Sequence, residues 1–325
     1  MNSKIEIQKV LERLAKSDQK INFHTPVEVT PDLQAYLNYY GFQLEKVDYY
    51  FGKIEIDGTK IMVQMFSPEP SIGTVILLHG YLDHVGILKN IIQHLNHHQY
   101  RVISYDLQGH GLSEGEKASV NSFSDYLVTL EKLMKKARNE IPGPFYGIGH
   151  STGGAILINY VLKQEESHFD KVILIAPLIR SNLWFFSKIS FYLMKPFPFI
   201  KKIRRHFREN SSDEQFLDFI KIDPLQSKAI PINWLNSLIH WNKEIQTYSP
   251  TNKETLLIQG TKDTTVEWEY NINFIKEKFH SLHITIIKNG RHELFNEKPQ
   301  IRDEVFRNIV PFFEKSIARN TELNQ

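Results

Sequence analysis

Residues 145–153 read Phe-Tyr-Gly-Ile-Gly-His-Ser-Thr-Gly, and this stretch decides the fold expected for the 325-residue chain. Its last five residues have the form Gly-x-Ser-x-Gly, in which glycines without a Cβ atom leave room for a sharp turn that holds the serine in a strained conformation. The residues before the turn suit a short strand, and the mostly apolar segment 155–162 after it suits a helix. A strand, a tight turn and a helix around Ser151 predict a nucleophilic serine in an α/β protein.

Strand-like runs rich in Val, Ile and Leu recur along the rest of the chain. They lie at 48–56, 60–66, 74–78, 101–105, 145–148, 171–175, 255–258 and 283–287. The first two are separated by the turn signal Asp57-Gly58, which predicts a hairpin. The later runs alternate with helix-like stretches, including one near 267–280 and one near 299–318. This alternation predicts a mostly parallel central sheet flanked by helices.

The segment 178–249, which we name the cap, breaks this alternation. It is aromatic and basic and contains prolines, but no clear strand is visible in it, so we expect a helical insertion. The predicted organisation is a helical N-terminal extension at 1–46, a first part of the core at 47–177, the cap, and a second part of the core at 250–325.

The composition is that of a globular protein. Hydrophobic residues make up 41% of the chain and charged residues 23%, with a formal net charge of +2, so nothing indicates a nucleic-acid-binding or disordered protein. Because there is no cysteine, disulfides and zinc–thiolate sites are excluded. Residues 1–20 lack the apolar stretch of a signal peptide, so we expect a cytoplasmic protein. The apolar region 183–200 is interrupted well short of the ~20 residues that a membrane span needs.

Ser151, Asp263 and His292 are the candidate catalytic residues. A serine hydroxyl is a poor nucleophile at neutral pH, so it needs a histidine base and a carboxylate that orients this base. Asp263 and His292 each follow one of the last two predicted strands, at the strand ends where α/β sheets present their ligands. The chain order Ser, Asp, His is the one expected when the serine lies at such a turn.

Backbone amides are the candidate donors to the oxyanion that forms when the serine attacks a carbonyl group. The amide of Thr152 directly follows the nucleophile. The second donor is expected from the loop after the strand at 74–78, so we assign it to the amide of Tyr81.

Each motif also has an ordinary structural interpretation. Gly-x-Ser-x-Gly alone could be a glycine-rich turn, and its spacing does not match the dinucleotide pattern G-x-G-x-x-G. Asp263 could be a turn residue, and a single histidine among fourteen is more often structural. Asp106 is a rival acid, but its neighbours Gly109-His110-Gly111 suggest that it shapes a loop. The combination of all motifs at matching strand ends favours a working triad.

Together these residues resemble the α/β-hydrolases grouped as lysophospholipases, monoacylglycerol lipases and serine aminopeptidases. The resemblance covers residues of about 50–315 and lies in His-Gly-Tyr-Leu-Asp-His at 79–84, Asp-Leu-Gln-Gly-His-Gly-Leu-Ser-Glu-Gly at 106–115, the turn at 149–153, Gly-Thr-Lys-Asp at 260–263 and His-Glu-Leu-Phe-Asn-Glu at 292–297. It implies an α/β-hydrolase fold with the triad and oxyanion roles assigned above. Gln108 stands where the family usually has arginine, so a cation that could brace the nearby loops is missing.

The cap is expected to choose the substrate. Between 171 and 208 there are nine Lys or Arg and no Asp or Glu, and aromatic residues are interleaved with them. The candidate substrate-binding residues are Trp184, Phe185, Phe191, Lys201, Lys202, Arg204 and Arg205. An apolar surface beside a basic one suits an acyl chain with an anionic head group, or peripheral contact with an anionic membrane. Alternatively, the aromatics pack the cap onto the core and the cations are merely solvated.

The resemblance favours a hydrolase of lipid carboxylic esters, either a lysophospholipid or a monoacylglycerol, that needs no cofactor and no metal. One alternative is an esterase for small esters, or for acyl esters on an acidic carrier protein that docks on the basic cap. An aminopeptidase is less favoured, because it needs a carboxylate near the site and the first part of the cap offers only cations. A protein of another class would keep the fold as a non-catalytic binding protein. A nucleic-acid partner is not expected.

Overall fold

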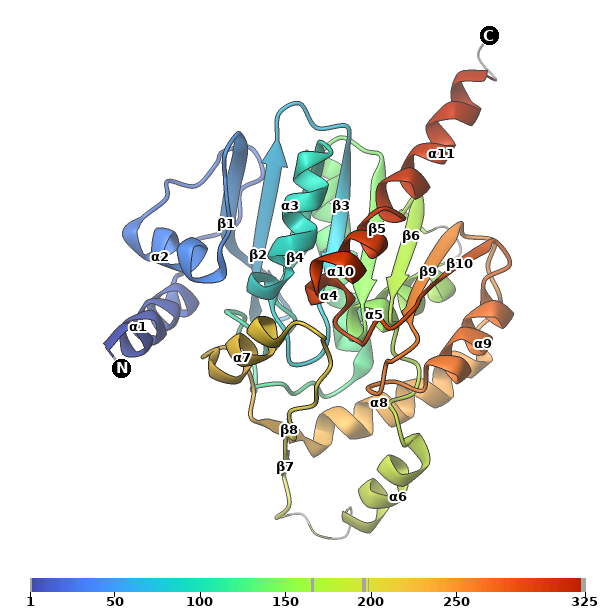
Figure 1. Cartoon of the computed structure of the whole chain (residues 1–325). Coiled ribbons are helices and arrows are strands. Elements are labelled where there is room, and N and C mark those ends of the chain that lie inside the picture. The colour runs from blue at the N-terminus through green and yellow to red at the C-terminus, as the bar shows by residue number, and fades with distance from the viewer. Residues whose placement is uncertain (1, 165–166, 195–196, 198, 323–325) are drawn as a thin grey trace.

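The computed structural model describes residues 2–164, 167–194, 197 and 199–322, and it contains one central eight-stranded sheet (Figure 1). The strand order is β1-β2-β4-β3-β5-β6-β9-β10. The strands are β1 Val47–Ile56, β2 Thr59–Pro68, β3 Gly73–Leu78, β4 Tyr100–Tyr105, β5 Phe145–His150, β6 Lys171–Ile175, β9 Thr255–Gly260 and β10 Leu282–Ile287. Each strand predicted from the sequence is present, with its ends shifted by at most two residues.

The sheet is antiparallel at one side and parallel elsewhere. β1 and β2 form a hairpin whose turn residues Asp57 and Gly58 have positive φ angles of 48° and 79°, as a two-residue hairpin turn requires. β2 pairs with β4 in antiparallel fashion, and all pairs from β4 to β10 are parallel. Every residue of β3, β5, β6 and β9 is buried, because helices cover both faces. This burial explains the continuous apolar runs of these strands.

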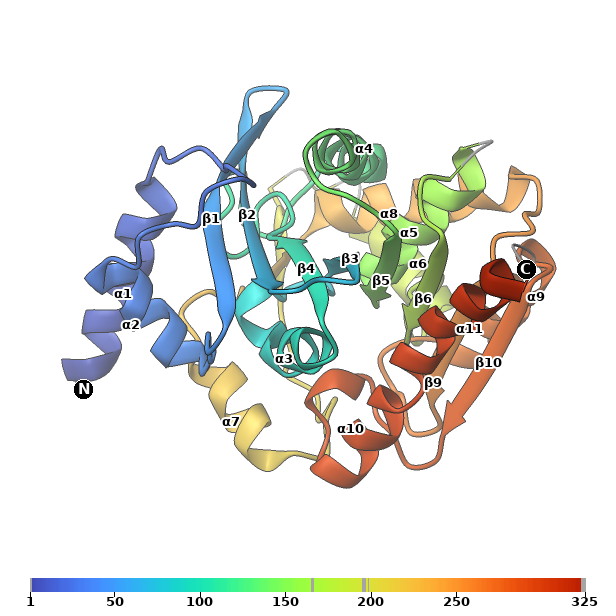
Figure 2. The same ribbon diagram turned by 90° about the horizontal axis from the view of Figure 1, so that it is seen from above.

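Helices cover the two faces of the sheet (Figure 2). α4 Phe123–Glu140, α5 Thr152–Lys163 and α9 Trp268–Lys278 contribute to one hydrophobic cluster, and α3 Lys89–His97 contributes to the other together with α10 Pro299–Phe306 and α11 Ile309–Glu322. The 3-10 turns are η1 Val85–Leu88, η2 Ile245–Thr247 and η3 Leu294–Asn296. No helix of the described residues is both long and apolar enough to cross a membrane.

The single helix expected near 299–318 is in fact two, α10 and α11, so this expectation was wrong. Pro311 has no N–H to donate, and its ring would clash with the carbonyl of residue 307 in a continuous helix. The chain therefore breaks between the helices, and Pro311 lies in the first turn of α11, where a proline is tolerated.

The N-terminal extension packs against the core through α1 Asn2–Lys16 and α2 Pro31–Tyr40. Thr30 caps α2 by accepting a hydrogen bond from the Leu33 amide at 3.3 Å, and Gly41 ends it in the left-handed conformation with φ of 76°. Buried residues of both helices join the cluster that also contains residues of β1 and β2.

The cap contains α6 Trp184–Met194, α7 Glu214–Ile222 and α8 Ile232–Glu244, and also two short strands. β7 Lys202–Arg204 and β8 Ala229–Pro231 pair in antiparallel fashion, which corrects the expectation that the cap has no strand. Strands of three residues are too short to show an alternating pattern in the sequence. In Figure 1, α6 forms the end of the molecule farthest from the sheet.

Candidate active site

Ser151 lies at the turn between β5 and α5, at the carboxyl end of a central strand. Its φ of 51° and ψ of −111° are a conformation that residues other than glycine rarely adopt. A Cβ atom on Gly149 would stand 2.4 Å from the carbonyl oxygen of Gly153, and one on Gly153 would stand equally close to that of Leu78. The turn therefore requires glycine at both positions.

Asp263 and His292 follow β9 and β10 at the same edge of the sheet. His292 Nδ1 lies 2.8 Å from Asp263 Oδ2. Asp263 also accepts hydrogen bonds from the amides of Thr265 and Val266, at 2.8 Å and 3.2 Å. A carboxylate only accepts, so the proton of the neutral imidazole sits on Nδ1 and the lone pair is on Nε2.

Two opposing effects set the pKa values of Asp263 and His292. Burial disfavours the charged form of each group, and their mutual attraction favours it. Burial by itself would raise the pKa of Asp263, but the charge and hydrogen bond of His292 hold it below its ordinary value. Burial by itself would lower the pKa of His292, but the charge and hydrogen bond of Asp263 raise it above its ordinary value. Asp263 is therefore ionised at neutral pH and stabilises a positive charge on the imidazole.

The segments that hold Ser151 and His292 are neighbours, but within the described residues no hydrogen bond joins these two side chains. The link between their segments is His150, whose Nε2 lies 3.0 Å from the carbonyl oxygen of His292. The ring centroids of His150 and His292 are 4.9 Å apart. Hydrogen bonds between a nucleophile and its base are often long before a substrate binds.

The loop with Tyr81 lies against the nucleophile turn. A Cβ atom on Gly80 would stand 3.3 Å from the Cβ atom of Ser151. The ring of Tyr81 stacks on Trp234 of α8 with 3.5 Å between centroids, and its hydroxyl donates to the carbonyl of Ala118 at 2.7 Å. In the described part of the chain, the amides of Tyr81 and Thr152 donate no backbone hydrogen bond, so both are free to meet a substrate.

Asp106 shapes a loop, as expected. Its two carboxylate oxygens accept hydrogen bonds from the amides of Val85 and Leu112, at 2.8 Å and 2.7 Å. The neighbouring Leu107 amide donates to Nε2 of His79 at 2.9 Å. These contacts hold the segment on both sides of Tyr81 against the segment after β4.

The candidate residues of the cap divide into two groups. Trp184 and Phe191 are buried in the hydrophobic cluster, as the packing interpretation predicts, whereas Phe185 is exposed. Lys201, Lys202 and Arg204 are exposed, and Lys202 pairs with Glu116 at 3.3 Å.

Arg205 is the candidate cation of the cap that reaches toward the core. It is half-buried and donates to Gln226 Oε1 at 2.5 Å. Its charge acts on the carboxyl groups of Asp83 and Glu293, lowering the pKa of each against the effect of burial.

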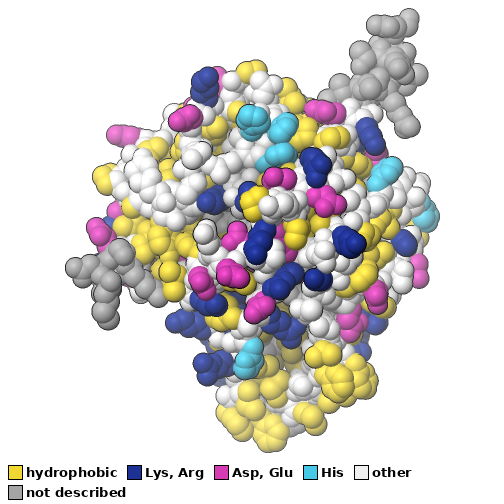
Figure 3. Space-filling view, in the orientation of Figure 1, with side chains coloured by type: hydrophobic (Ala, Val, Ile, Leu, Met, Phe, Trp, Pro, Cys, Tyr) yellow, Lys and Arg dark blue, Asp and Glu magenta, His cyan; other side chains and the backbone are white. Residues whose placement is uncertain are grey.

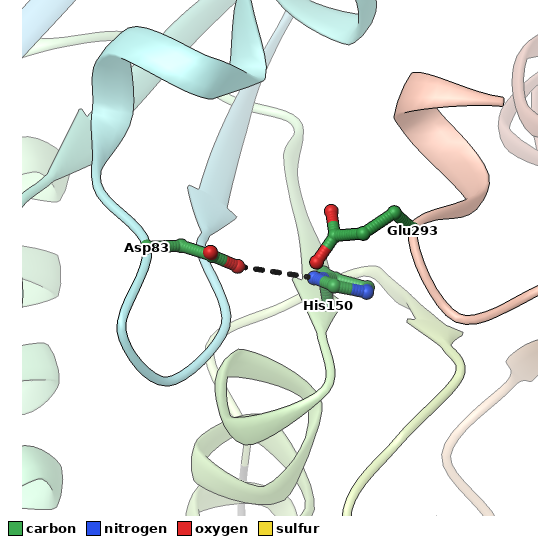
Figure 4. Close-up of side chains that lie close together, drawn as sticks. All are labelled: Asp83, His150 and Glu293. Atoms are coloured by element: carbon green, nitrogen blue, oxygen red, sulfur yellow. Dashed lines mark ion pairs between the residues drawn. The ribbon is translucent and has the colours of Figure 1, made fainter. Parts of the chain in front are cut away.

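Asp83, His150 and Glu293 form a second buried cluster beside these residues, which was not predicted from the sequence. Figure 4 shows both carboxylates pointing toward the His150 ring from separate loops. Burial raises the pKa of Asp83 to about 7 and raises that of Glu293, while it lowers the pKa of His150 to about 4. Asp83 and His150 lie in motifs quoted above, but a motif does not say which side chains of different loops meet.

A buried ion pair between His84 and Asp223 was also not foreseen. His84 Nε2 lies 2.7 Å from Asp223 Oδ2, and the hydroxyl of Tyr40 donates to Asp223 Oδ1 at 2.9 Å. The pair joins the segment after Tyr81 to the cap and to α2. The only signal in the sequence was the second histidine of the 79–84 motif.

A family model described as "Serine aminopeptidase, S33" matches residues 69–299 of the chain. The chain belongs to this family. It is therefore a hydrolase of the lipase and esterase type, and the predicted resemblance is confirmed.

Relatives of this S33-family chain extend over most of its length. A monoglyceride lipase of Rattus norvegicus is 26% identical over 275 residues, which cover 82% of this chain and 90% of the rat protein. The phospholipase YtpA of Bacillus subtilis is 22% identical over 257 residues, which cover 76% and 96% of the two chains.

Solved structures confirm the α/β-hydrolase fold. A soluble variant of the monoglyceride lipase from Saccharomyces cerevisiae superposes with a TM-score of 0.73 at 19% identity, covering 85% of this chain and 97% of the yeast chain. The monoacylglycerol lipase of Paleococcus ferrophilus gives a TM-score of 0.68 at 22% identity, with coverage of 78% and 97%.

Proposed function

We propose that this chain hydrolyses carboxylic esters of lipid-like substrates, either a monoacylglycerol or a lysophospholipid, through an acyl-Ser151 intermediate. The observation that carries the proposal is the 2.8 Å hydrogen bond between His292 and Asp263, at the same edge of the sheet as Ser151 in its strained turn. The relatives named monoglyceride lipase and phospholipase support the choice of lipid esters.

In the proposed reaction, the Ser151 hydroxyl attacks the ester carbonyl while His292 Nε2 takes its proton. Asp263 keeps the other imidazole proton on Nδ1 and stabilises the cation that forms. The amides of Tyr81 and Thr152 donate to the oxyanion, each contributing about 3–4 kcal/mol to the stability of the transition state. His292 then protonates the leaving alcohol, and a water activated by the same base releases the fatty acid.

An exposed apolar patch on the cap supports the preference for acyl chains. Leu193 and Phe199 have exposed fractions of 68% and 75%, and the patch forms the hydrophobic tip of the molecule in Figure 3. Its members are Leu183, Phe185, Phe186, Ile189, Tyr192, Leu193, Phe197 and Phe199. A contiguous exposed apolar patch of this kind commonly marks a site that binds an apolar partner.

Cations beside the patch support peripheral contact with an anionic membrane. Lys201, Arg204 and Arg208 are exposed, and Figure 3 shows basic side chains gathered between the apolar tip and the rest of the molecule. Apolar side chains would enter the interface while the cations meet anionic head groups. An acidic carrier protein could use the same cations, but it would have no need of the apolar tip.

Hydrolysis of p-nitrophenyl esters from C2 to C16, with Ser151→Ala as the control, tests the proposal. Activity that depends on Ser151 and rises with chain length supports a lipid hydrolase. A maximum at C2–C4 would favour a small-ester enzyme. No activity, together with no labelling of Ser151 by a fluorophosphonate, would favour a non-catalytic binding protein.

An aminopeptidase is a second candidate, because Asp83 and Glu293 bring carboxylates from the core close to the nucleophile turn. The argument against an aminopeptidase rested on the first part of the cap, which offers only cations, and did not consider carboxylates of the core. Aminoacyl p-nitroanilides test this candidate directly, since an ester hydrolase leaves them intact whereas an aminopeptidase cleaves them.

A further inference from the structure

Three buried side chains converge from three of the loops that hold the candidate catalytic groups (Figure 4). Asp83 lies two residues after Tyr81, His150 directly precedes Ser151, and Glu293 directly follows His292. Their exposed fractions are only 6%, 2% and 5%. One potential ligand atom from each lies within 4.8 Å of the other two.

The hydrogen bonds of His150 leave a lone pair facing the two carboxylates. Nε2 lies 3.0 Å from the carbonyl oxygen of His292, and because a carbonyl only accepts, the ring proton is on Nε2. The unprotonated Nδ1 is 3.8 Å from Asp83 Oδ2, which is too far for a hydrogen bond.

The two carboxylates also lack strong donors. Within the described residues, Asp83 accepts no side-chain or backbone hydrogen bond at its carboxylate. Glu293 accepts only long contacts of 3.4 Å from the side-chain amides of Asn210 and Asn296. His150 Nδ1 and the two carboxylates are therefore three hydrogen-bond acceptors that lie close together and nearly buried, and none of them has a strong donor. A cation bound between them would stabilise this arrangement.

Gly80 packs closely against two of these side chains. A Cβ atom on Gly80 would stand 2.7 Å from Asp83 Oδ2 and 3.0 Å from His150 Nδ1. Only glycine at this position therefore lets the loop with Asp83 lie against His150 without a clash.

We propose that Asp83, His150 and Glu293 form a binding site for a divalent transition-metal ion such as Zn²⁺. One imidazole nitrogen and two carboxylate oxygens are a ligand set that zinc accepts, with bonds of about 2.0–2.2 Å and a further position for water. In a tetrahedral site two such ligand atoms lie about 3.4 Å apart, so the separation of 3.8 Å must close by about 0.4 Å and the widest one by up to about 1.4 Å when the ion binds.

The second partner of the histidine fits this assignment. A histidine that binds a metal usually donates its other ring N–H to a backbone carbonyl or a carboxylate, as His150 does to His292. Arg205 of the cap acts on both carboxylates, and its charge opposes the metal. Once metal binding has displaced their protons, the two carboxylates outweigh this single positive charge. A bound ion would tie the three catalytic loops together.

Calorimetric titration of the full chain, stripped with a chelator, with Zn²⁺ tests the site. The wild type is expected to bind one ion, and Asp83→Asn or Glu293→Gln is expected to weaken binding by at least about tenfold. The bound ion should also raise the midpoint of thermal unfolding of the wild type but not of these variants. Mg²⁺ should give no comparable heat, because it disfavours a nitrogen ligand.

A surface histidine cluster on α3 provides the matched control. His94 and His98 have ring centroids 4.5 Å apart, and His97 is exposed beside them, so these residues could also bind zinc. The double variant His97→Gln/His98→Gln should leave the tight site intact. No binding by the wild type, or binding that this double variant alone abolishes, would overturn the proposal.

A further experiment identifies the ligands in the wild-type protein, so its result does not depend on whether a variant folds. X-ray absorption at the zinc edge of the wild type should show one imidazole and oxygen ligands. Two or more imidazoles would place the ion at the α3 cluster and overturn the proposal. Arg205→Gln removes the opposing charge and should bind Zn²⁺ more tightly, whereas weaker binding would contradict the assignment.

Discussion

At the scale of single residues, Asp263 holds the imidazole of His292 in one tautomer. It accepts from Nδ1 of His292 at 2.8 Å, which leaves Nε2 as the atom able to take a proton from Ser151. An amide in place of the carboxylate can donate to Nδ1, so it favours the opposite tautomer and no longer stabilises an imidazolium.

Asp263→Asn should therefore lower kcat by about 10⁴-fold while the fold is retained. The measurement is ester hydrolysis at saturating substrate, with the midpoint of thermal unfolding as the check on folding. Asp106→Asn cannot replace this variant, because the Asp106 carboxylate accepts hydrogen bonds from two loop amides and its loss would alter the loop structure. If Asp263→Asn retained more than about a tenth of the wild-type kcat, the assigned role of Asp263 would be wrong.

At the scale of elements, the buried pair of His84 and Asp223 joins α2, the segment after Tyr81 and the end of α7. Burial opposes the charge on each group, but His84 and the hydrogen bonds around Asp223 lower the pKa of Asp223. The charge of Asp223 in turn raises the pKa of His84 against the effect of burial. Each group therefore contributes stability when it is ionised.

The stability that this pair contributes should decrease at low pH and also at high pH. The part that comes from Asp223 is present above its ordinary pKa of 3.8 and is lost as the pH falls through the lower value of the folded protein. The part from His84 is present below its ordinary pKa of 6.5 and is lost as the pH rises through the higher folded value. The pair should stabilise the protein most between these two ordinary values.

Asp223→Asn should accordingly reduce the free energy of unfolding most between pH 4 and pH 6.5, the interval between the ordinary pKa values of 3.8 and 6.5. Urea unfolding of both proteins across pH 3–9 measures this difference. Asp218→Asn, on the exposed face of the same helix, is the matched control and should change stability little. A difference for Asp223→Asn that does not vary with pH would contradict an ionic role.

The sequence predicted the elements that follow from local patterns. The core strands were found because buried parallel strands are continuous apolar runs, and the turn around Ser151 was found because the close contacts of Gly149 and Gly153 demand glycine. β7 and β8 were missed because three residues carry too little pattern.

The parts of the site that were missed depend on packing between distant residues. His84 and Asp223 are 139 positions apart, and Glu293 is far from Asp83 in the chain. Their meeting is decided by the whole fold, which no local pattern records. For the same reason, the sequence could not separate the buried candidate residues of the cap from the exposed ones. It did not reveal that Trp184 faces the core whereas Phe185 faces solvent.

At the scale of the whole molecule, the apolar tip and its basic border are the proposed contact with a lipid surface. Phe185→Ser, Phe186→Ser and Leu193→Ser together should strongly weaken binding to phosphatidylglycerol vesicles, measured by sedimentation, and leave the midpoint of unfolding almost unchanged because these side chains are exposed. Equal binding by the wild type and the triple variant would contradict this role of the tip.

The basic border should contribute separately. Lys201→Gln with Arg204→Gln should lower affinity for anionic vesicles by about 2 kcal/mol at low salt, with little effect on neutral ones, since each cation near the surface contributes about 1 kcal/mol. Lys202 is left in place because it pairs with Glu116. Unchanged affinity for anionic vesicles would show that these cations are merely solvated.

The central claim is that lipid esters are cleaved through an acyl group on Ser151. It is tested most directly by acid-quenching the protein during turnover of a long-chain monoacylglycerol or its p-nitrophenyl ester and measuring the intact mass and the modified peptide. The account predicts a mass increase of one acyl group on the peptide with Ser151, absent in Ser151→Ala. Turnover that continues in Ser151→Ala, or acylation confined to another residue, would contradict it.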